Sequence, residues 1–497
     1  MQTLEPTQNP AAQPIAKSYD MDDWRSGYRS QPEEFDYWID EVDGEIPTDL
    51  TGTYFRNGPG LLEISGHPVK HPFDGDGMVS AIAFQNGQAH YKNRFVRTEG
   101  YVAEQAAGKP LYRGVFGTQK SGGPLANAFD LRLKNIANTN ILYWGNKLLA
   151  LWEAAEPHGL DPHTLKTLGL DDLNGVLEAG DAFSAHPRID PSCDRTAGQP
   201  CLVNFAVKTG LSSTITIFEF DPKGRLVHRH KHSVPGFAFL HDFAITPNYC
   251  IFFQNPVSFN PFPFLVGLKG AAECIELNPK QSTRALLIPR DGKGEVRTLE
   301  IPPCFVFHHA NAFEQEGKVI VDSVCYSDFP SLDGGEYAEV DFDHVPEGQL
   351  WRFELDLASG KTRAEHLISR CCEFPVLHPS QVGQPYRYLY IGAAHRGSGN
   401  APLQALLKYD LDTGTETLYS VAPRGFAGEP IFVPHPQGQA EDDGWVLLQT
   451  YNAETRRSEL RILDAKNLTD IARLKLKHHI PYGLHGSFAS TYLGPVR

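Results

Sequence analysis

Four histidines in the sequence share surroundings that suit metal binding. His186, His241, His308 and His485 lie in the segments FSAHPRID, AFLHDFAIT, FVFHHANAFE and IPYGLHGSF. Four neutral imidazoles that met in the fold would suit a divalent first-row metal, iron among them. No local motif such as H-E-x-x-H is present, so the fold would have to assemble the site. A lone histidine in an apolar strand is more often a core residue than a ligand, and that alternative stays open for each one.

Three glutamates also lie in apolar surroundings. Glu153 follows LLALW, Glu373 lies in CCEFP and Glu429 lies in FAGEPIFV. A buried carboxylate needs a partner, and a metal-bound histidine usually donates its second N–H to an acceptor such as a carboxylate. Three such glutamates would orient three imidazoles and offset the positive charge of the ion. The alternative is an ordinary ion pair with lysine or arginine, which we favour for most glutamates elsewhere.

The segment FVFHHANAFE at 305–314 carries two adjacent histidines. Its aromatic and mostly apolar residues predict a β-strand. Successive side chains of a strand point to opposite faces, so His308 and His309 cannot both face the same site. The pattern alone does not decide which of the two does.

Hairpins recur along the whole chain and predict an all-β protein. Asn-Gly at 86–87, Gly-Asn at 145–146 and Asp-Pro-Lys-Gly at 221–224 stand between apolar runs, as tight turns require. Helical signals are confined to residues 19–28 and 170–180. Consecutive antiparallel hairpins must hide their strand edges, which a propeller or a large barrel does. In a propeller the inner strands of different blades face one axis, where distant histidines can meet.

The composition limits the classes of partner. The chain has 497 residues, of which 41% are apolar and 21% charged, with a formal net charge of −15. This balance is ordinary for a globular protein, and the length is ample for a sizeable core. We expect no nucleic-acid partner, because lysine and arginine must neutralise phosphates in such complexes. A hydrophobic ligand and a neutral membrane contact stay open.

Cysteine usage and the N-terminus indicate the compartment. Eight cysteines without a C-x-x-C pair are too few for a disulfide framework, so we expect reduced thiols and a cytoplasmic location. Residues 1–18 lack the apolar core of a secretory signal and predict a disordered leader. Residues 19–497 contain no linker that would divide them, so we expect one domain. No run of about 18 apolar residues is present to span a membrane, which leaves peripheral contact as the closest association.

Distinctive segments are spread along nearly the whole chain. They are GTYFRNGPG at 52–60, HPFDGDGM at 71–78, SAHPRID at 184–190, FLHDFAIT at 239–246, FVFHHANAFE at 305–314, CCEFP at 371–375, GEPIFVP at 428–434, EDDGWVL at 441–447 and PYGLHG at 481–486. No single segment is decisive, but together and in this order the sequence resembles the carotenoid cleavage oxygenases. The resemblance implies a seven-bladed β-propeller with Fe(II) on its axis and a cap of loops and helices that forms a substrate tunnel.

The resemblance also implies roles for individual residues. By position, the iron ligands would be His186, His241, His308 and His485, and their carboxylate partners would be Glu153 for His241, Glu373 for His308 and Glu429 for His485. The first histidine of FVFHHANAFE matches the family ligand, so His309 would point away from the iron. Four histidines in an octahedral arrangement leave two adjacent positions open. O2 would enter one, and the methyl group of Thr139 would crowd the other.

The implied substrate is a long conjugated polyene without an acid–base handle. The resemblance is strongest to the branch that cleaves apocarotenoids at the 15,15′ bond with O2 to give retinal-type aldehydes. Such a reaction needs a reactive iron–oxygen species and a tunnel that positions one double bond. Matching positions imply an aromatic tunnel lining of Tyr28, Phe73, Phe116, Trp152, Phe239, Tyr326 and Phe374. For each of these residues, ordinary propeller core is the alternative.

The segment FNPFPFLVGLKG at 259–270 is apolar and broken by two prolines. It is too short and irregular to span a bilayer. Because a polyene substrate resides in membranes and exposed apolar patches often mark interaction surfaces, we expect this segment to rim the tunnel mouth and enter the bilayer surface. A buried loop is the alternative.

Three other functions stay open. The same iron site would serve the cleavage of intact carotenoids, stilbenoids or lignin-derived compounds. It would also serve a retinoid isomerohydrolase. A non-catalytic propeller acting as a binding platform is the third, and it predicts no bound metal. Iron analysis of the purified protein and of a His308→Ala variant separates this last function from the others.

Overall fold

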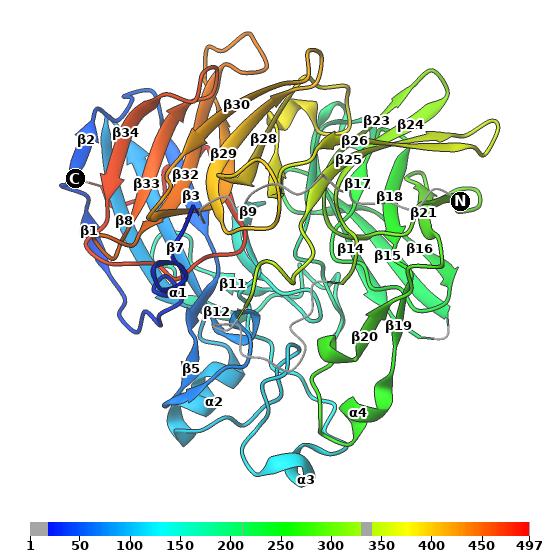
Figure 1. Ribbon diagram of the computed structural model, residues 1–497, viewed down its shortest axis with the longest axis horizontal. Helices are drawn as coiled ribbons and strands as arrows, with labels where there is room; N and C mark the ends of the chain where they lie inside the picture. The colour runs from blue at the N-terminus through cyan, green and yellow to red at the C-terminus, as the bar shows by residue number, and fades with distance from the viewer. Residues whose placement is uncertain (1–17, 211, 330–339, 497) are drawn as a thin grey trace.

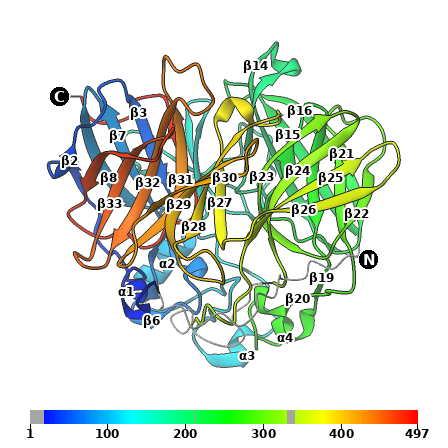
Figure 2. The same cartoon turned by 45° about the horizontal axis from the view of Figure 1, so that its top comes forward.

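The protein is a seven-bladed β-propeller, as predicted (Figures 1 and 2). The computed structural model describes residues 18–210, 212–329 and 340–496. The predicted leader at 1–18 therefore lies, apart from Ser18, outside the described residues. The single-domain boundary at 19–497 stays a prediction.

Five of the blades are antiparallel sheets of four strands that follow one another in sequence. The first is β9 (Asn140–Trp144), β10 (Lys147–Leu151), β11 (His158–Leu160) and β12 (Thr167–Leu170), and the second is β13 (Arg188–Cys193), β14 (Gln199–Lys208), β15 (Ser212–Phe220) and β16 (Leu226–Pro235). The third is β17 (Ala244–Ile245), β18 (Tyr249–Gln254), β21 (Thr283–Pro289) and β22 (Arg297–Ile301). The fourth is β23 (Phe305–Gln315), β24 (Lys318–Tyr326), β25 (Gln349–Asp356) and β26 (Thr362–Ile368), and the fifth is β27 (Cys372–Val376), β28 (Tyr388–Ala394), β29 (Leu403–Asp410) and β30 (Thr415–Ser420).

The remaining two blades join the two ends of the chain. One contains β1 (Asp36–Trp38), β8 (Gln88–Phe95), β7 (Asp76–Gln85), β3 (Gly52–Arg56) and β35 (Gly486–Ala489), with β4 (Pro59–Leu61) paired to β7. The other contains β2 (Val42–Gly44), β34 (Asp470–Lys475), β33 (Arg457–Asp464), β32 (Gly444–Asn452) and β31 (Gly425–Pro434). Because N-terminal β3 pairs with β35 and β2 pairs with β34, the ring is closed twice and its strand edges are covered.

Turns form where the sequence predicts them. Asn86 and Gly87 both have positive φ, 52° and 70°, between β7 and β8. Gly145 and Asn146 do the same between β9 and β10. These are the conformations of tight hairpin turns. Between adjacent blades the inward-facing apolar side chains interlock, as where Phe205 of β14 packs edge-on against Phe252 of β18 with ring centroids 5.0 Å apart.

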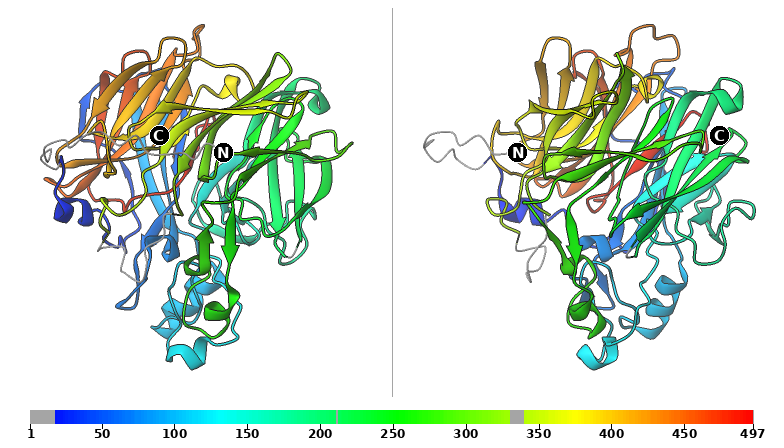
Figure 3. Two further views of the ribbon diagram at one scale, coloured as in Figure 1. Left: turned by 45° about the vertical axis from the view of Figure 1, so that its right-hand side comes forward. Right: turned by 90° about the vertical axis from the view of Figure 1, so that its right-hand side faces the viewer.

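A cap projects from one end of the propeller (Figures 1 and 3). It contains the helices α2 (Glu99–Ala107), α3 (Gly123–Asn127) and α4 (Pro261–Leu265), and the short hairpins β5 (Glu63–Ile64) with β6 (His67–Pro68) and β19 (Val257–Phe259) with β20 (Ile275–Leu277). The helix predicted near 19–28 is α1 (Met21–Arg25). None of the described helices is long and apolar enough to cross a membrane.

The helix predicted at 170–180 is wrong. This segment forms turns, in which Leu173, Asn174 and Gly175 have φ of 55°, 62° and 80°. The Asp171 carboxylate accepts a hydrogen bond from the Leu173 amide at 2.8 Å and pairs with Lys147. The acidic residue that looked like a helix cap therefore stabilises a turn instead, because its side chain competes for nearby backbone groups.

Candidate metal centre

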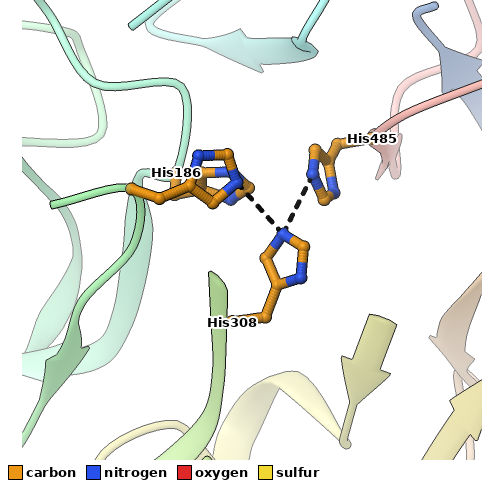
Figure 4. A group of neighbouring side chains, drawn as sticks. His186, His308 and His485 are labelled. Carbon is orange, nitrogen blue, oxygen red and sulfur yellow. Dashed lines mark hydrogen bonds between the residues drawn. The ribbon is translucent and has the colours of Figure 1, made fainter. Parts of the chain in front are cut away.

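The four predicted histidines meet at the propeller axis. His186 and His241 lie just before β13 and β17, His308 lies inside β23, and His485 immediately precedes β35. The Nε2 atoms of His186 and His241 are 2.9 Å apart, those of His241 and His308 are 3.3 Å apart, and those of His308 and His485 are 3.2 Å apart. Figure 4 shows three of these rings turned toward one point. Four imidazoles from four different blades thus form one metal-binding group.

Three of the imidazoles are held from behind by the predicted glutamates. His241 Nδ1 lies 2.5 Å from Glu153 Oε1, His308 Nδ1 lies 2.6 Å from Glu373 Oε2, and His485 Nδ1 lies 2.8 Å from Glu429 Oε1. Glu373 lies in β27 and Glu429 in β31, whereas Glu153 follows β10, so every pair joins two separate parts of the chain. Among the described residues, His186 has no carboxylate partner of this kind.

The tautomers set by these pairs fit a metal ion. A carboxylate accepts the proton of Nδ1, which leaves Nε2 of the same ring as a bare lone pair. The Nε2 atoms of His241, His308 and His485 are therefore acceptors that converge on one point, an arrangement that a cation stabilises. Metal–imidazole bonds of about 2.1 Å place neighbouring nitrogens about 3.0 to 3.4 Å apart for right-angled to tetrahedral geometry. The observed separations match the size of one first-row ion.

The charges around the site also fit a divalent ion. Glu429 pairs with the guanidinium of Arg56, whose Nη1 also donates to Leu484 O at 3.2 Å. Three carboxylates and this one guanidinium leave two net negative charges, which an ion of charge 2+ would offset. Tyr326 donates its hydroxyl proton to Glu373 Oε1 at 2.8 Å, and the Gly486 amide donates to Glu429 Oε2 at 3.0 Å. The carboxylates are therefore fixed on both sides.

Burial and charge act in opposite directions on the ionisable groups. Burial lowers the pKa of His186 well below its ordinary value, and the neighbouring imidazoles add to this shift. Burial alone would raise the pKa of Glu373, but the facing His308 outweighs it and the pKa falls below 4.5. The pKa of Glu429 falls for the same reason, with Arg56 adding to the effect of His485. Burial alone would lower the pKa of His308, but the facing Glu373 raises it. The carboxylates are thus ionised, and metal binding must displace the proton that Glu373 favours on His308, because a ligating imidazole is neutral.

His309 takes no part in the group. Its Nδ1 lies 2.8 Å from Ser323 Oγ on β24, and its ring packs edge-on against Phe253 at 4.9 Å. Its backbone amide donates to Asp242 Oδ2 and its carbonyl accepts from Arg188. Adjacent histidines thus serve different purposes, one in the metal group and one in the propeller core.

Thr139 lies beside the group, directly before β9. It is 7% exposed, its carbonyl accepts a hydrogen bond from the His485 amide at 3.0 Å, and its hydroxyl donates to Asn138 Oδ1 at 3.3 Å. The backbone of Thr139 therefore positions a metal-binding histidine, and its hydroxyl is already engaged.

The predicted tunnel residues fall into separate groups. Phe374 lies against the metal group, with its ring centroid 5.5 Å from that of His308 and 5.4 Å from that of His485. Tyr326 of β24 and Phe239 contact aromatic residues of β23, where Phe239 packs on Phe305 at 6.0 Å and Tyr326 packs on Phe307 at 5.8 Å. Phe73 and Phe116 pack on each other at 5.3 Å in the cap, Tyr28 packs on Tyr482 at 4.6 Å, and Trp152 is buried directly before Glu153.

Phe307 is an aromatic residue that the sequence did not single out. Its ring lies 5.3 Å from His241, 4.7 Å from Phe305 and 5.8 Å from Tyr326. Strict alternation would turn Phe307 away from the face of its neighbour His308, but the β23–β24 register shifts between Val306 and His309. This irregularity lets consecutive side chains approach one site, and no local sequence signal marks it.

Comparison with known proteins gives one consistent result. A family model described as RPE65, retinal pigment epithelial membrane protein, matches residues 28–490. The apocarotenoid-15,15′-oxygenase of Synechocystis sp. is 58% identical over 489 residues, which cover 98% of this chain and 100% of that protein. The crystal structure of cobalt-substituted Synechocystis ACO aligns with a TM-score of 0.94 at 58% identity and covers 96% of this chain and 100% of that one.

More distant relatives differ in name. The lignostilbene-α,β-dioxygenase isozyme III of Sphingomonas paucimobilis is 30% identical over 482 residues, which cover 92% of this chain and 94% of that protein. Similarity at this distance spans both carotenoid and stilbene oxygenases. These proteins therefore belong to one family, whereas the substrates in their names differ.

Proposed function

The chain belongs to the RPE65 family of carotenoid cleavage oxygenases, and we propose that it holds Fe(II) with His186, His241, His308 and His485 and splits the 15,15′ double bond of an apocarotenoid with O2. The observation that carries this proposal is the convergence of four imidazoles, three of which are backed by carboxylates. The bond and the substrate class follow the relative from Synechocystis, which is 58% identical over nearly the whole length of both chains.

Each carboxylate has a defined task in this proposal. Glu153, Glu373 and Glu429 hold the protons of three Nδ1 atoms, so that the rings neither rotate nor change tautomer. An Fe(II) ion bound there would supply the one-electron chemistry that ground-state O2 and a polyene lack by themselves. The protein needs no nucleophile or general base, because the substrate offers no proton to transfer.

Thr139 restricts access to the ion in this proposal. Its hydroxyl donates to Asn138, and we infer that its methyl group faces the metal group and crowds one coordination position. O2 then has a single approach. A Thr139→Ser variant removes the methyl group and keeps the hydroxyl, so it separates crowding from hydrogen bonding.

The aromatic residues would hold the polyene. Phe374 and Phe307 lie directly against the metal-binding imidazoles, and Tyr326 and Phe239 extend the aromatic surface outward. A flat conjugated chain gains both apolar burial and ring contacts against such walls. We propose that these residues, with Tyr28, Phe73, Phe116 and Trp152, line the substrate tunnel.

One experiment tests the metal and the bond together. The purified protein is loaded anaerobically with Fe(II) and then incubated in air with 8′-apocarotenal, β-carotene or a hydroxylated stilbene, and the product masses are recorded. Retinal from 8′-apocarotenal alone is the expected result. Aldehydes from the stilbene alone would favour the lignostilbene type of relative, and retinal from an iron-free preparation would overturn the metal assignment.

We further propose that the cap touches a lipid surface. The exposed apolar residues at its tip form an apolar rim: Leu125, Phe129, Leu131, Phe262 and Leu268. Two separate segments build this rim, and the Phe129 amide donates to Leu265 O at 2.7 Å where they meet. Clustered exposed side chains of this size mark interaction surfaces, and a polyene substrate would be drawn from a membrane. Peripheral membrane contact follows from this proposal, and we also propose the cytoplasmic location that the eight unpaired, buried cysteines favour.

The structure changes which residues of 259–270 should be tested. Phe264 is 8% exposed and packs under the Arg113 guanidinium, which lies 4.0 Å from its ring, so an aspartate there would disturb the cap itself. Phe262→Asp with Leu268→Asp is expected to lose flotation with phosphatidylcholine vesicles. Leu168→Asp with Leu170→Asp alters equally exposed residues of β12 and should leave flotation unchanged. Equal flotation of both variants would reject the proposal.

A further inference from the structure

Two buried thiols lie together beneath the turn that joins β13 to β14, away from the metal group. The sulfur atoms of Cys193 and Cys201 and a carboxylate oxygen of Asp190 all lie within 4.8 Å of one another. Cys193 is 2% exposed and Cys201 is fully buried, whereas the intervening residues 197–200 are exposed. The pair is therefore one layer below the surface, under a short turn.

A guanidinium is aimed at both sulfur atoms. Arg290 Nη2 lies 3.6 Å from Cys201 Sγ and 3.9 Å from Cys193 Sγ, while its Nη1 donates to Asp190 Oδ2 at 2.6 Å and its Nε donates to Glu219 Oε1 at 3.0 Å. A fixed positive charge beside a thiol favours the thiolate. The hydrogen bond from Cys201 lowers the pKa of the Cys193 thiol to about 6, with Arg290 adding to the shift.

The Arg290 guanidinium also argues against metal binding by the two sulfurs and the Asp190 carboxylate. Two sulfurs and a carboxylate could hold a soft metal ion, but arginine keeps its charge at any physiological pH and already occupies the space facing the sulfurs. A cation would be repelled there. We propose that Cys193 and Cys201 are a reversible dithiol–disulfide pair, oxidised by a hydroperoxide and reduced by a thiol.

The reaction balances with hydrogen peroxide as the oxidant. The Cys193 thiolate attacks one peroxide oxygen, which forms a sulfenic acid and releases hydroxide; the hydroxide takes the Cys201 proton and becomes water. The Cys201 thiolate then attacks the Cys193 sulfur, the S–S bond forms, and the expelled hydroxide takes up the proton first lost by Cys193. Two thiols lose two electrons, and the peroxide O–O bond gains them.

The charged groups around the pair keep it poised for this reaction. Glu219 Oε2 accepts from Arg195 at 2.8 Å and lies 3.8 Å from Cys193 Sγ. Asp190 and Glu219 together balance Arg290 and Arg195, and the Cys250 thiol of β18 and the His230 imidazole of β16 are further titratable groups near the cluster. Because these carboxylates and guanidinium groups pair with one another, the Cys193 thiolate is the group whose charge changes in the reaction.

Trypsin places the two thiols in separate peptides, which makes the test direct. Cleavage after Arg188, Arg195 and Lys208 yields IDPSCDR with Cys193 and TAGQPCLVNFAVK with Cys201. The intact metal-loaded protein is treated with equimolar hydrogen peroxide, alkylated and digested. The expected product is these two peptides joined, two hydrogens lighter than their sum, and it should disappear after treatment with a dithiol reductant.

The chain supplies its own control. Cys304 and Cys325 are hydrogen-bonded neighbours and are equally buried. Within the described part of the chain, no guanidinium donates to either sulfur. A thiol with a pKa near 6 is ionised about 30-fold more than an ordinary thiol at neutral pH, so the Cys193–Cys201 link should form at least ~10-fold faster than a Cys304–Cys325 link.

Two variants complete the design. Cys193→Ser and Cys201→Ser should each abolish the link and leave the iron content of the protein unchanged. Equal rates for both cysteine pairs, or no link between the two peptides, would overturn the proposal. So would stoichiometric Zn²⁺ binding in equilibrium dialysis that Cys193→Ser removes and Cys304→Ser does not, because it would make the pair a metal site.

Discussion

Two buried polar clusters of the propeller differ in how their charges are balanced. One is the axial cluster of four histidines and three glutamates, and the other is the Arg290 cluster on the β13–β14 side. Arg290 lies inside its cluster and meets Asp190 at 2.6 Å and Glu219 at 3.0 Å. The axial cluster instead points lone pairs inward at separations of 2.9 to 3.3 Å.

The comparison shows how a fold prepares a binding site. A buried charge is tolerated when its partners are already present, and then it serves the structure. Where several lone pairs instead converge on one point, the fold holds an arrangement that is unfavourable by itself, and the binding energy of an ion would offset this cost. The propeller holds both clusters on strands of different blades and on the segments next to those strands, which restricts how far either cluster can relax.

The largest effect is expected from removing one axial imidazole. His308→Ala should abolish both metal retention and product formation, because it removes the nitrogen that lies near two other Nε2 atoms. Folding of the metal-free protein should survive, since the change also removes one crowded lone pair. Metal analysis and a thermal melt of the apo protein measure the two effects.

The matched control is the neighbouring residue. His309→Ala should keep the metal and lose stability, because it deletes a buried hydrogen bond to Ser323 and leaves a cavity. If His309→Ala loses the metal and His308→Ala keeps it, the assignment of the adjacent histidines is inverted.

Removing Arg290, the cation of the other cluster, should lower stability and leave the metal content unchanged, which is the opposite of the result expected for His308→Ala. Arg290→Leu leaves the buried Asp190 without its guanidinium and Glu219 with Arg195 as its remaining cation, and breaking such a network costs about 3–5 kcal/mol of folding free energy. Metal content per folded molecule should not change, because no axial residue contacts Arg290. Denaturant titration and metal analysis of the same sample check both statements, and a loss of metal without a loss of stability would contradict them.

Particular residues show how far the sequence alone could reach. The hairpin turns at 86–87 and 145–146 were predictable because positive φ at asparagine and glycine is a local preference. The histidines and glutamates were identified because the whole series of segments resembles a family. The residue pattern around them indicated only that they lie in or beside strands. The family match over residues 28–490 accounts for that success.

Other features depend on contacts that no local pattern encodes. The pairing of Arg56 with Glu429 joins β3 to β31, and Arg290 reaches the Cys193–Cys201 pair from the end of β21. Phe307 approaches His241 only because the register of β23 shifts. The false helix at 170–180 arose because an aspartate that begins a turn and one that begins a helix look alike in sequence.

A smaller effect is expected from the carboxylates behind the imidazoles. Glu373→Gln and Glu429→Gln should lower metal affinity about 10- to 100-fold, as is typical when the outer partner of a ligand is lost. Glu153→Gln should lie at or below the low end of this range, because the Glu153 side chain is 32% exposed, against 14% for Glu373 and 12% for Glu429, and water can replace it. Competition with a chelator measures the affinities, and an equal loss for all three would remove exposure as the cause.

The smallest expected effect is a pH dependence of the folding stability, which tests whether the axial cluster acts through its charges. The folded-state pKa of Glu373 lies below its ordinary value of 4.5, so this carboxylate stabilises the folded protein above pH 4.5 and the contribution is lost as the pH falls through the lowered pKa. Burial alone would lower the pKa of His308, but the facing Glu373 raises it above 6.5, so this part of the stabilisation is lost as the pH rises through the raised pKa. The difference in unfolding free energy between wild-type apo protein and Glu373→Gln should therefore be largest between about pH 6.5 and 4.5 and shrink on both sides of this range. A difference that stays constant to pH 3, measured by denaturant titration, would mean that Glu373 acts through shape and not through its charge, and the axial cluster would then lose its distinction from a neutral hydrogen-bond network.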